Sequence, residues 1–188
     1  MSDLQAPVVE VFASFQGEGL YVGVPQVFVR LAGCDLDCLY CDTRYARMTP
    51  DRCRIYVGDD QETLPNPVSA EDLLEAVNMW RGLVRSVSIT GGEPLLDPDF
   101  VLRLARGLKS RNFDVHLETA GHRPDALQTV APAVNVIAAD IKLPSTVRQP
   151  VDPAAMRRFW ELAGRMNSFA KIVVTRDVTV NEFNATCE

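Results

Sequence analysis

The sequence predicts an α/β fold in which a parallel sheet is covered on its outside by helices. Segments rich in Val, Ile and Phe alternate along the chain with segments of helical periodicity. Strand–helix alternation of this kind is typical of βαβ units and a parallel sheet. The 188 residues include 47% hydrophobic residues, enough to build a core. We therefore predict a single domain over residues 1–188.

Most of the chain can be assigned to a strand or a helix. Strands are predicted at 8–15, 26–31, 86–90, 114–118, 134–141 and 170–175. Helices are predicted at 70–80, 98–109, 123–129 and 153–166, with Ser69 and Asp97 as N-caps of the first two. Residues 44–68 contain three prolines and a glycine without a sustained period. We interpret this stretch as a variable, irregular insertion.

Charge and hydropathy exclude two classes of partner. The chain has 19 Lys and Arg against 25 Asp and Glu, a net charge of −6, which argues against a general nucleic-acid binder. No apolar run approaches the roughly 18 residues of a membrane span. Asp3, Glu10 and Glu18 interrupt the N-terminal segment, which is unlike a secretory signal. We expect a cytoplasmic protein that binds neither nucleic acid nor membrane.

Several predicted strands have one apolar face and one face that becomes polar toward the C-terminal end. Residues two apart share a face, so His116 and Glu118 lie together, as do Asp140 and Lys142. A sheet covered by helices should instead be almost continuously apolar. The polar faces predict a wet cavity, because parallel α/β folds bind ligands at these strand ends. A solvent-facing sheet edge is the alternative.

Three of the five cysteines lie within one short loop. Cys34, Cys38 and Cys41 directly follow a predicted strand, within residues 33–43. In a reducing compartment such clustering indicates metal binding rather than disulfides. A structural zinc site needs four protein ligands, and Cys53 could supply the fourth. An iron–sulfur cubane held by only three cysteines would keep one iron open to a ligand. The spacing alone leaves both possibilities open.

Two motifs carry a resemblance to a known superfamily. The C-x-x-x-C-x-x-C run, with Tyr40 before its last cysteine, resembles the signature of the radical S-adenosylmethionine (SAM) superfamily. Residues 90–94, Thr-Gly-Gly-Glu-Pro, end the next predicted strand, where that superfamily has a G-G-E-P stretch. Residues 12–19, 28–34 and 41–43 further resemble the 7-carboxy-7-deazaguanine synthase family. The resemblance implies a partial (β/α) barrel of the radical SAM type, with about five to six parallel strands and helices outside.

The resemblance also implies a reaction and its cofactors. Members of this family are lyases of 7-deazapurine, queuosine-type, biosynthesis. They convert 6-carboxy-5,6,7,8-tetrahydropterin to 7-carboxy-7-deazaguanine with loss of ammonia. They use a 4Fe-4S cluster, SAM and Mg²⁺, and a low-potential electron donor such as flavodoxin. No catalytic residue beyond those that hold the cluster and SAM is implied.

Site residues are carried over from the family position by position. The resemblance implies that Cys34, Cys38 and Cys41 hold the cluster and that Thr43 contacts Mg²⁺. The residues implied to contact SAM are Tyr40, Gly91, Gly92, Glu93, Glu118, Thr119, Asp140 and Lys142. Those implied to bind the pterin are Gln16, Gly17, Glu18, Arg30 and Thr90, several of them in an N-terminal substrate-binding extension over residues 1–25. A carboxylate suits the guanidine-like edge of a pterin, and an arginine suits the substrate carboxylate.

Two other functions fit part of this pattern. A small glycyl-radical-enzyme activase would share the cysteine loop, but it has no need of pterin-binding residues such as Gln16 and Glu18. A non-catalytic metal-binding interaction module would explain the cysteines, but not residues 91–94 or the polar strand faces.

The C-terminal end of the chain limits the predicted barrel. Five barrel strands are predicted from residue 26 onward, and residues 176–188 are too few for a further helix and strand. The edge of the fifth strand then needs a cover. We therefore expect either a homodimer or an incompletely walled site.

Overall fold

The computed structural model describes residues 4–187 and confirms the α/β prediction. Eight strands form one sheet in the order β10-β9-β8-β7-β3-β2-β4-β5. Five neighbouring strands form one parallel run, namely β3 (Pro25–Leu31), β7 (Ser86–Gly91), β8 (Asp114–Thr119), β9 (Val136–Asp140) and β10 (Ser168–Lys171). Strand β2 (Val8–Phe15) pairs antiparallel with β3. The five parallel strands are the five that the sequence predicts, with ends that differ by up to four residues.

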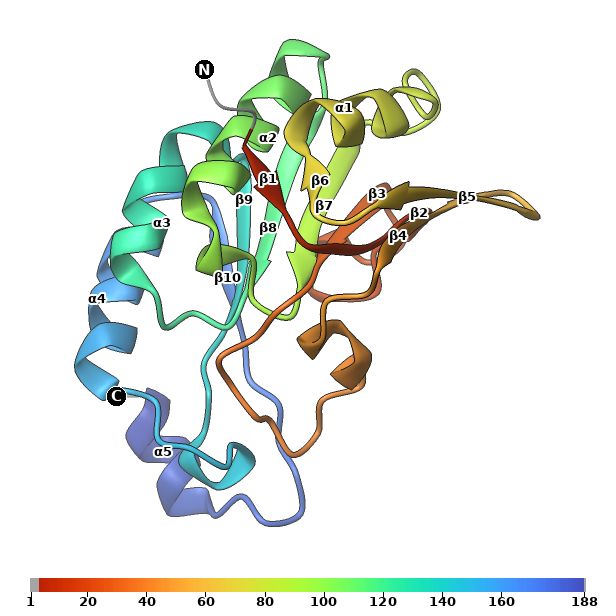
Figure 1. Cartoon of the computed structure of the whole chain (residues 1–188). Helices are drawn as coiled ribbons and strands as arrows, with labels where there is room; N and C mark the ends of the chain where they lie inside the picture. Colours follow the sequence, from red (N-terminus) through yellow and green to blue (C-terminus); the bar gives the residue numbers. More distant parts are fainter. Residues whose placement is uncertain (1–3, 188) are drawn as a thin grey trace.

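Helices connect the parallel strands and lie on one side of the sheet (Figure 1). They are α1 (Ala70–Asn78), α2 (Pro98–Ser110), α3 (Pro124–Val130) and α4 (Pro153–Ala163). The predicted cap of α1 is confirmed, because the Ser69 hydroxyl accepts a hydrogen bond of 3.0 Å from the Asp72 amide. Helix α4 ends before Gly164, three residues earlier than predicted.

The prediction of an irregular segment at 44–68 is wrong. A 3-10 helix, η2 (Arg44–Arg47), is followed by a hairpin of β4 (Arg52–Val57) and β5 (Asp60–Pro65), which extends the sheet beside β2. Strand β6 (Val68–Ser69) then pairs with β1 (Gln5–Ala6). Gly58 has a φ of +61° in the hairpin turn. The sequence carried this signal as Gly58-Asp59 preceded by the alternation of Cys53, Ile55 and Val57, which face inward.

The last described residues of the chain are helical. Helix α5 (Val180–Cys187) follows β10, and the Glu182 carboxylate accepts hydrogen bonds of 2.7 Å from both the amide and the hydroxyl of Ser145. Within the described residues β10 pairs only with β9, so its outer edge is open as expected. The 3-10 helix η1 (Gly19–Tyr21) packs against β10, where a Cβ at Gly19 would lie 2.0 Å from the Phe169 ring. The N-terminal extension therefore reaches across to the last strand.

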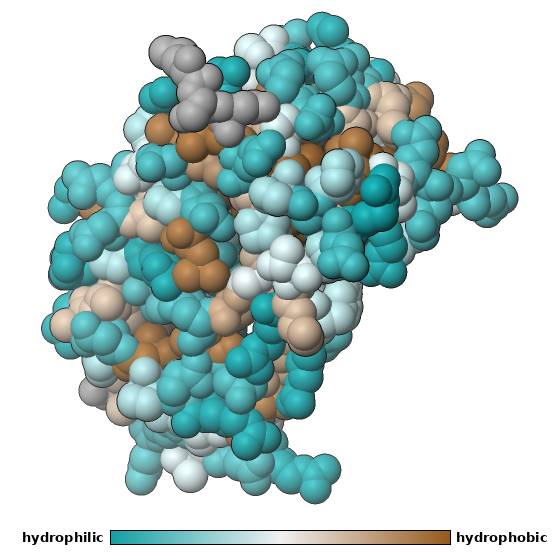
Figure 2. All heavy atoms as spheres, viewed as in Figure 1, coloured by the Kyte–Doolittle hydropathy of each residue, from teal (hydrophilic) through white to brown (hydrophobic). Residues whose placement is uncertain are grey.

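The hydrophobic core lies on one face of the parallel strands, between the sheet and the helices. Fully buried side chains from strands and helices pack into one cluster that includes Val29, Ile89, Leu117, Ile137, Leu73, Leu104, Leu127 and Phe159. Residues on the opposite strand faces are mostly polar, as the alternation predicts. The surface shown in Figure 2 is mostly hydrophilic, with hydrophobic residues in small separate groups. In the described part of the chain, no helix has the length and apolar character needed to cross a membrane.

Candidate active site

A cavity of about 440 Å³ lies at the carboxyl ends of the parallel strands. Every site residue predicted from the sequence except Glu93 lines it. These residues are Gln16, Gly17, Glu18, Arg30, Cys34, Cys38, Tyr40, Cys41, Thr43, Thr90, Gly91, Gly92, Glu118, Thr119, Asp140 and Lys142. The polar strand faces thus border a cavity, and the alternative of a solvent-facing edge is wrong.

The loop that carries the three cysteines is held from two sides. The amide of Gly33 donates a hydrogen bond of 2.7 Å to Ala46 O in η2. On the other side, the amide of Leu39 donates a hydrogen bond of 3.0 Å to Thr146 O. The Arg148 amide likewise donates to Asp37 O at 3.0 Å. The segment after β9, which α5 anchors through Glu182, therefore fixes one side of the cysteine loop.

The donor set fits an iron–sulfur cluster better than a structural zinc ion. Burial raises the pKa of the Cys34 and Cys38 thiols, so both need a metal to stabilise the thiolate. No three Cys, His, Asp or Glu side chains among residues 4–187 are grouped around a single ion. A cubane does not require such a group, because each cysteine binds a different iron. Cys53 is fully buried in the hydrophobic core and does not line the cavity, so it cannot complete a zinc site.

The two glycines at the end of β7, Gly91 and Gly92, allow the cysteine loop to approach. A Cβ at Gly92 would lie 2.0 Å from Gly33 O, and one at Gly91 would lie 2.2 Å from Leu31 O. The amide of Glu93 donates a hydrogen bond of 2.8 Å to the same Gly33 oxygen. The glycine motif therefore packs directly against the start of the cysteine loop, in addition to lining the cavity.

Glu93 corrects one sequence prediction. Its side chain was expected to face SAM, but the carboxylate is 1% exposed and does not line the cavity. It accepts hydrogen bonds from the Leu95 amide at 2.9 Å, the Thr119 hydroxyl at 2.7 Å and the Ala120 amide at 2.7 Å. Burial raises the pKa of Glu93, although these bonds oppose the shift. The carboxylate thus joins the ends of β7 and β8 and positions Thr119 and Ala120 at the cavity wall.

Glu118 lies among the residues that were predicted to bind substrate. Its Oε1 accepts hydrogen bonds of 2.8 Å from Gln16 Nε2 and from Ser88 Oγ, and its Oε2 accepts one of 2.9 Å from Thr90 Oγ1. The sequence assigned Glu118 to SAM, whereas Gln16 and Thr90 were assigned to the pterin. The structure brings the three together.

A buried series of hydrogen bonds continues from Gln16 into the protein. Gln16 Nε2 also donates to Gln26 Oε1 at 3.2 Å, and Gln26 Nε2 lies 3.0 Å from His116 Nδ1. The His116 ring meets the Tyr21 ring edge-on at 4.6 Å between centroids. His116 therefore supports Gln16 through Gln26.

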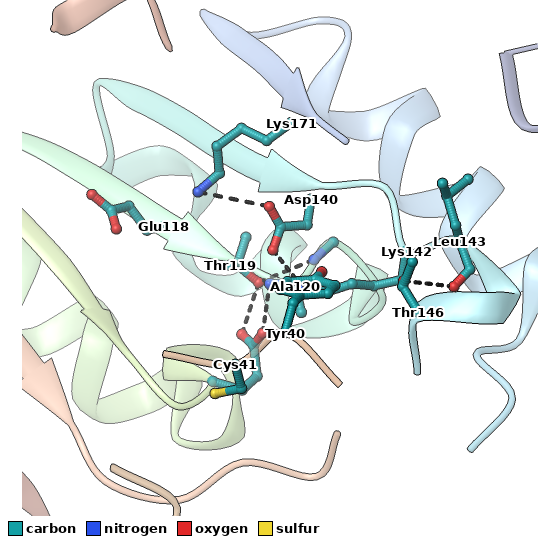
Figure 3. A network of polar contacts seen from close by, with 12 residues as sticks. Tyr40, Cys41, Glu118, Thr119, Ala120, Asp140, Lys142, Leu143, Thr146 and Lys171 are labelled. Atoms are coloured by element: carbon teal, nitrogen blue, oxygen red, sulfur yellow. Dashed lines mark hydrogen bonds and ion pairs between the residues drawn. The ribbon is translucent and has the colours of Figure 1, made fainter. Parts of the chain in front are cut away.

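Asp140, Lys142 and Lys171 meet at the cavity wall beside Glu118 (Figure 3). Lys142 Nζ lies 2.5 Å from Asp140 and donates a hydrogen bond of 2.9 Å to the Tyr40 hydroxyl. Burial alone would lower the pKa of Lys142, but Asp140 and Tyr40 raise it. Lys171, which lines the cavity but was not predicted, forms an ion pair with Glu18 and lies 3.7 Å from Asp140. Its position on the polar face of the last strand was the available signal.

Arg30 presents part of its guanidinium to the cavity. Its Nε donates a hydrogen bond of 2.9 Å to Glu10, and its Cζ lies 5.7 Å from the centroid of the Phe12 ring. Within residues 4–187, neither Nη group has a hydrogen-bond partner. This free edge suits a carboxylate, which two parallel N–H groups can bind in a bidentate manner.

Comparison with known proteins places the chain in a family. The model of the radical SAM superfamily matches residues 28–184. A 7-carboxy-7-deazaguanine synthase of Geobacter sulfurreducens is 40% identical over 181 residues, which cover 93% of this chain and 72% of that protein. The chain belongs to the 7-carboxy-7-deazaguanine synthase family. Membership of the radical SAM superfamily implies a 4Fe-4S cluster and SAM, and the three cavity cysteines fit that cluster.

Other relatives agree with this placement. A 7-carboxy-7-deazaguanine synthase of Methanopyrus kandleri is 42% identical over 144 residues, which cover 73% of this chain but 57% of that protein. The chain thus spans little more than half of some relatives. A crystal structure of QueE from Escherichia coli shares the fold, with a TM-score of 0.51 and 21% identity, and the match covers 97% of this chain and 88% of that one.

Proposed function

We propose that this chain is a 7-carboxy-7-deazaguanine synthase, which converts 6-carboxy-5,6,7,8-tetrahydropterin to 7-carboxy-7-deazaguanine with loss of ammonia. The observation that carries the proposal is the convergence of Gln16, Thr90 and Glu118 in the cavity that the three cysteines line. A polar group of hydrogen-bond acceptors and donors suits a pterin edge. The free edge of Arg30 suits the carboxylate that this substrate carries.

The chain's own residues would divide the cavity between cofactor and substrate. Cys34, Cys38 and Cys41 would hold the cluster, while Gly91, Gly92, Thr119, Asp140 and Lys142 would border SAM. When bound, the cluster and SAM together supply the radical that removes a hydrogen atom from the substrate. Thr43 and its neighbour Asp42 offer oxygen atoms at the cavity wall, the donor type that Mg²⁺ prefers.

The two other functions considered from the sequence are not favoured. A glycyl-radical activase acts on a protein backbone, for which the Gln16–Glu118 hydrogen bond in the cavity wall has no purpose. An interaction module with four cysteine ligands is excluded by the core position of Cys53. Membership of the 7-carboxy-7-deazaguanine synthase family supports the enzymatic function over both of them.

The decisive experiment is an anaerobic assay of the reconstituted protein. The protein is incubated with SAM, a chemical reductant and 6-carboxytetrahydropterin, and the products are identified by mass spectrometry. We expect 7-carboxy-7-deazaguanine and ammonia in equal amounts, with Cys38→Ser as an inactive control. SAM cleavage that is unaffected by the pterin, without the deazaguanine product, would contradict the proposal.

The proposal includes two partners. One is a low-potential electron donor such as flavodoxin, which would replace the chemical reductant in the same assay. The other is a second copy of the chain, because the edge of β10 is open and the extension exposes Phe15, Leu20 and Val22. Anaerobic sedimentation should then show a dimer that Leu20→Ser combined with Val22→Ser dissociates. A wild-type monomer with full turnover would contradict the homodimer.

A further inference from the structure

Glu10 on β2 is a buried carboxylate outside the cavity that the proposed function does not use. The residue is 8% exposed. It accepts hydrogen bonds of 2.9 Å from Arg30 Nε and from the Tyr45 hydroxyl, and Arg54 Nη2 lies 3.7 Å away. Side chains from β3, η2 and β4 thus converge on one carboxylate. Burial of a charge is costly unless it is paired, and these three side chains supply the partners that Glu10 needs.

The contact with Glu10 restricts the orientation of Arg30. An arginine side chain has many rotamers, and ordering it costs conformational entropy when a ligand binds. Here Glu10 engages Nε on one side, while the guanidinium packs over the Phe12 ring. The two Nη groups, which have no partner within residues 4–187, are left for a ligand. Arg30 is therefore ordered before its ligand arrives.

Tyr45 connects Glu10 to the region of the cysteine loop. It belongs to η2, which directly follows the cysteine loop and accepts the Gly33 amide hydrogen bond at Ala46 O. Through Tyr45 and Glu10, the position of Arg30 is thus defined relative to that loop. The distance between the bound carboxylate and the cofactor end of the cavity would be fixed in the same way.

We propose that Glu10 is a positioning residue, which holds the guanidinium of Arg30 so that its free edge receives the carboxylate of the substrate. This inference rests on the proposed function, in which the substrate carries a carboxylate. Glu10 itself does not touch the substrate. It acts through Arg30, and its effect should therefore be confined to ligands that Arg30 binds.

The test compares two pterins in Glu10→Gln. Equilibrium Kd values are measured anaerobically with SAM present and reductant absent, so that no turnover occurs. The Kd of 6-carboxytetrahydropterin should rise about tenfold or more, because a charge-assisted hydrogen bond is lost. The Kd of tetrahydropterin, which lacks the carboxylate, should change by less than about twofold, since its binding does not use that bond. Asp114→Asn, which breaks an exposed pair with Arg85, is the matched control and should change neither value.

A double-mutant cycle separates positioning from a general structural effect. If Glu10 acts through Arg30, Glu10→Gln should weaken binding no further when Arg30→Gln is already present. Equal losses for both pterins, or additive losses in the double variant, would overturn the inference. If Glu10→Gln does not fold, Glu10→Asp retains the charge but withdraws it by one methylene, and the same pattern is expected.

Failure of this inference can be distinguished from failure of the proposed function. If Arg30→Gln weakens the carboxylated pterin and Glu10→Gln does not, Glu10 is not a positioning residue and the proposed function stands. If Arg30→Gln itself has no effect on that ligand, the carboxylate is not bound at Arg30. In that case both the substrate assignment at this position and the role of Glu10 are wrong.

Discussion

Lys171, the last residue of β10, forms an ion pair with Glu18, which lies 153 positions earlier in the N-terminal extension. Glu18 follows β2, which pairs with β3 at the other end of the run of parallel strands, so this contact crosses the carboxyl ends of those strands. The Asn167 amide side chain adds a hydrogen bond of 3.0 Å to the Tyr21 hydroxyl. Together these contacts hold the extension against the strand at the open edge of the sheet.

Removal of the Lys171 cation should loosen the extension. We expect Lys171→Met to lower the free energy of unfolding by about 0.5–1 kcal/mol, a small value because Glu18 is more than half exposed. Burial lowers the pKa of Lys171, but Asp140 and Glu18 raise it overall, so this stabilisation is complete at neutral pH and is lost only as the pH rises through the raised value. Urea unfolding at neutral and alkaline pH checks both points.

The control for this variant is Lys109→Met, which removes an exposed lysine at the end of α2. It should leave stability nearly unchanged. Limited proteolysis should cleave residues 16–24 faster in Lys171→Met than in the control. Equal cleavage rates would show that the ion pair does not hold the extension.

Local sequence patterns predicted the parallel strands and most of the cavity wall. The three cysteines, the glycines at 91 and 92, and Glu118 all lie at or just after strand ends. Since parallel strands place their carboxyl ends at one edge, their position along the chain was enough to bring them together. The alternation of His116 and Glu118 with apolar residues also predicted which face would be polar.

Pairings between distant segments were beyond such patterns. The contacts of Glu10 with Arg30 and Tyr45, and of Lys171 with Glu18, join segments whose proximity depends on strand order. The orientation of Glu93 also depended on its surroundings, because the amide of Ala120 offers it a buried partner. The hairpin at 52–65 was missed for a different reason, since the prolines around it outweighed a short alternation.

The three cavity cysteines should be needed for iron binding, whereas Cys53 should not. Serine in place of Cys34, Cys38 or Cys41 should abolish iron binding in the anaerobically reconstituted protein, because a hydroxyl is a poor ligand for this cluster. Cys53→Ala should retain the full iron content and lower the free energy of unfolding by about 1–2 kcal/mol, since it leaves a small cavity in the core. Iron analysis and urea unfolding check the two effects. Loss of iron from folded Cys53→Ala would revive a four-cysteine site.

Alanine substitutions at Gly92 and Gly58 test the effects of steric contact and of backbone strain separately. A Cβ at Gly92 would collide with Gly33 O, so Gly92→Ala should displace the cysteine loop, reduce iron binding and cost about 1–3 kcal/mol or more. Gly58→Ala has open space around it and only the strain of its positive φ, which costs about 1–2 kcal/mol. Its iron content should be normal. If both variants bound iron equally well, the close packing at Gly92 would not matter for the cluster.

Replacement of Glu118 should weaken the binding of the pterin more than the binding of SAM. In Glu118→Gln the amide nitrogen cannot accept a hydrogen bond, so at least one of the donors Gln16, Ser88 and Thr90 loses its partner. We expect the affinity for the pterin to fall by about 1–3 kcal/mol, with SAM binding nearly unchanged. Separate titrations with each ligand check this difference. A larger loss for SAM would return Glu118 to the cofactor side.

The hydrogen bonds beneath Gln16 have a fixed direction that depends on neutral His116. Because an amide nitrogen only donates, Gln26 Nε2 donates to His116 Nδ1, while Gln26 Oε1 accepts from Gln16. A protonated ring would place a donor at Nδ1 against the Gln26 donor. Burial lowers the pKa of His116 below its ordinary value of 6.5, although the carboxylates of Asp114 and Glu118 oppose the shift.

Stability should therefore decrease on acidification in a way that depends on His116. The unfolded chain takes up a proton as the pH falls through about 6.5, whereas the folded chain does so only at lower pH, so folding is penalised between the two values. The penalty grows by at most about 1.4 kcal/mol per pH unit and stops once the folded ring is protonated. His116→Asn retains an acceptor for Gln26 but does not titrate, and His122 is present in both proteins. Urea unfolding across this range should give a steeper loss for the wild type, and parallel curves would show that His116 is not buried in its neutral form.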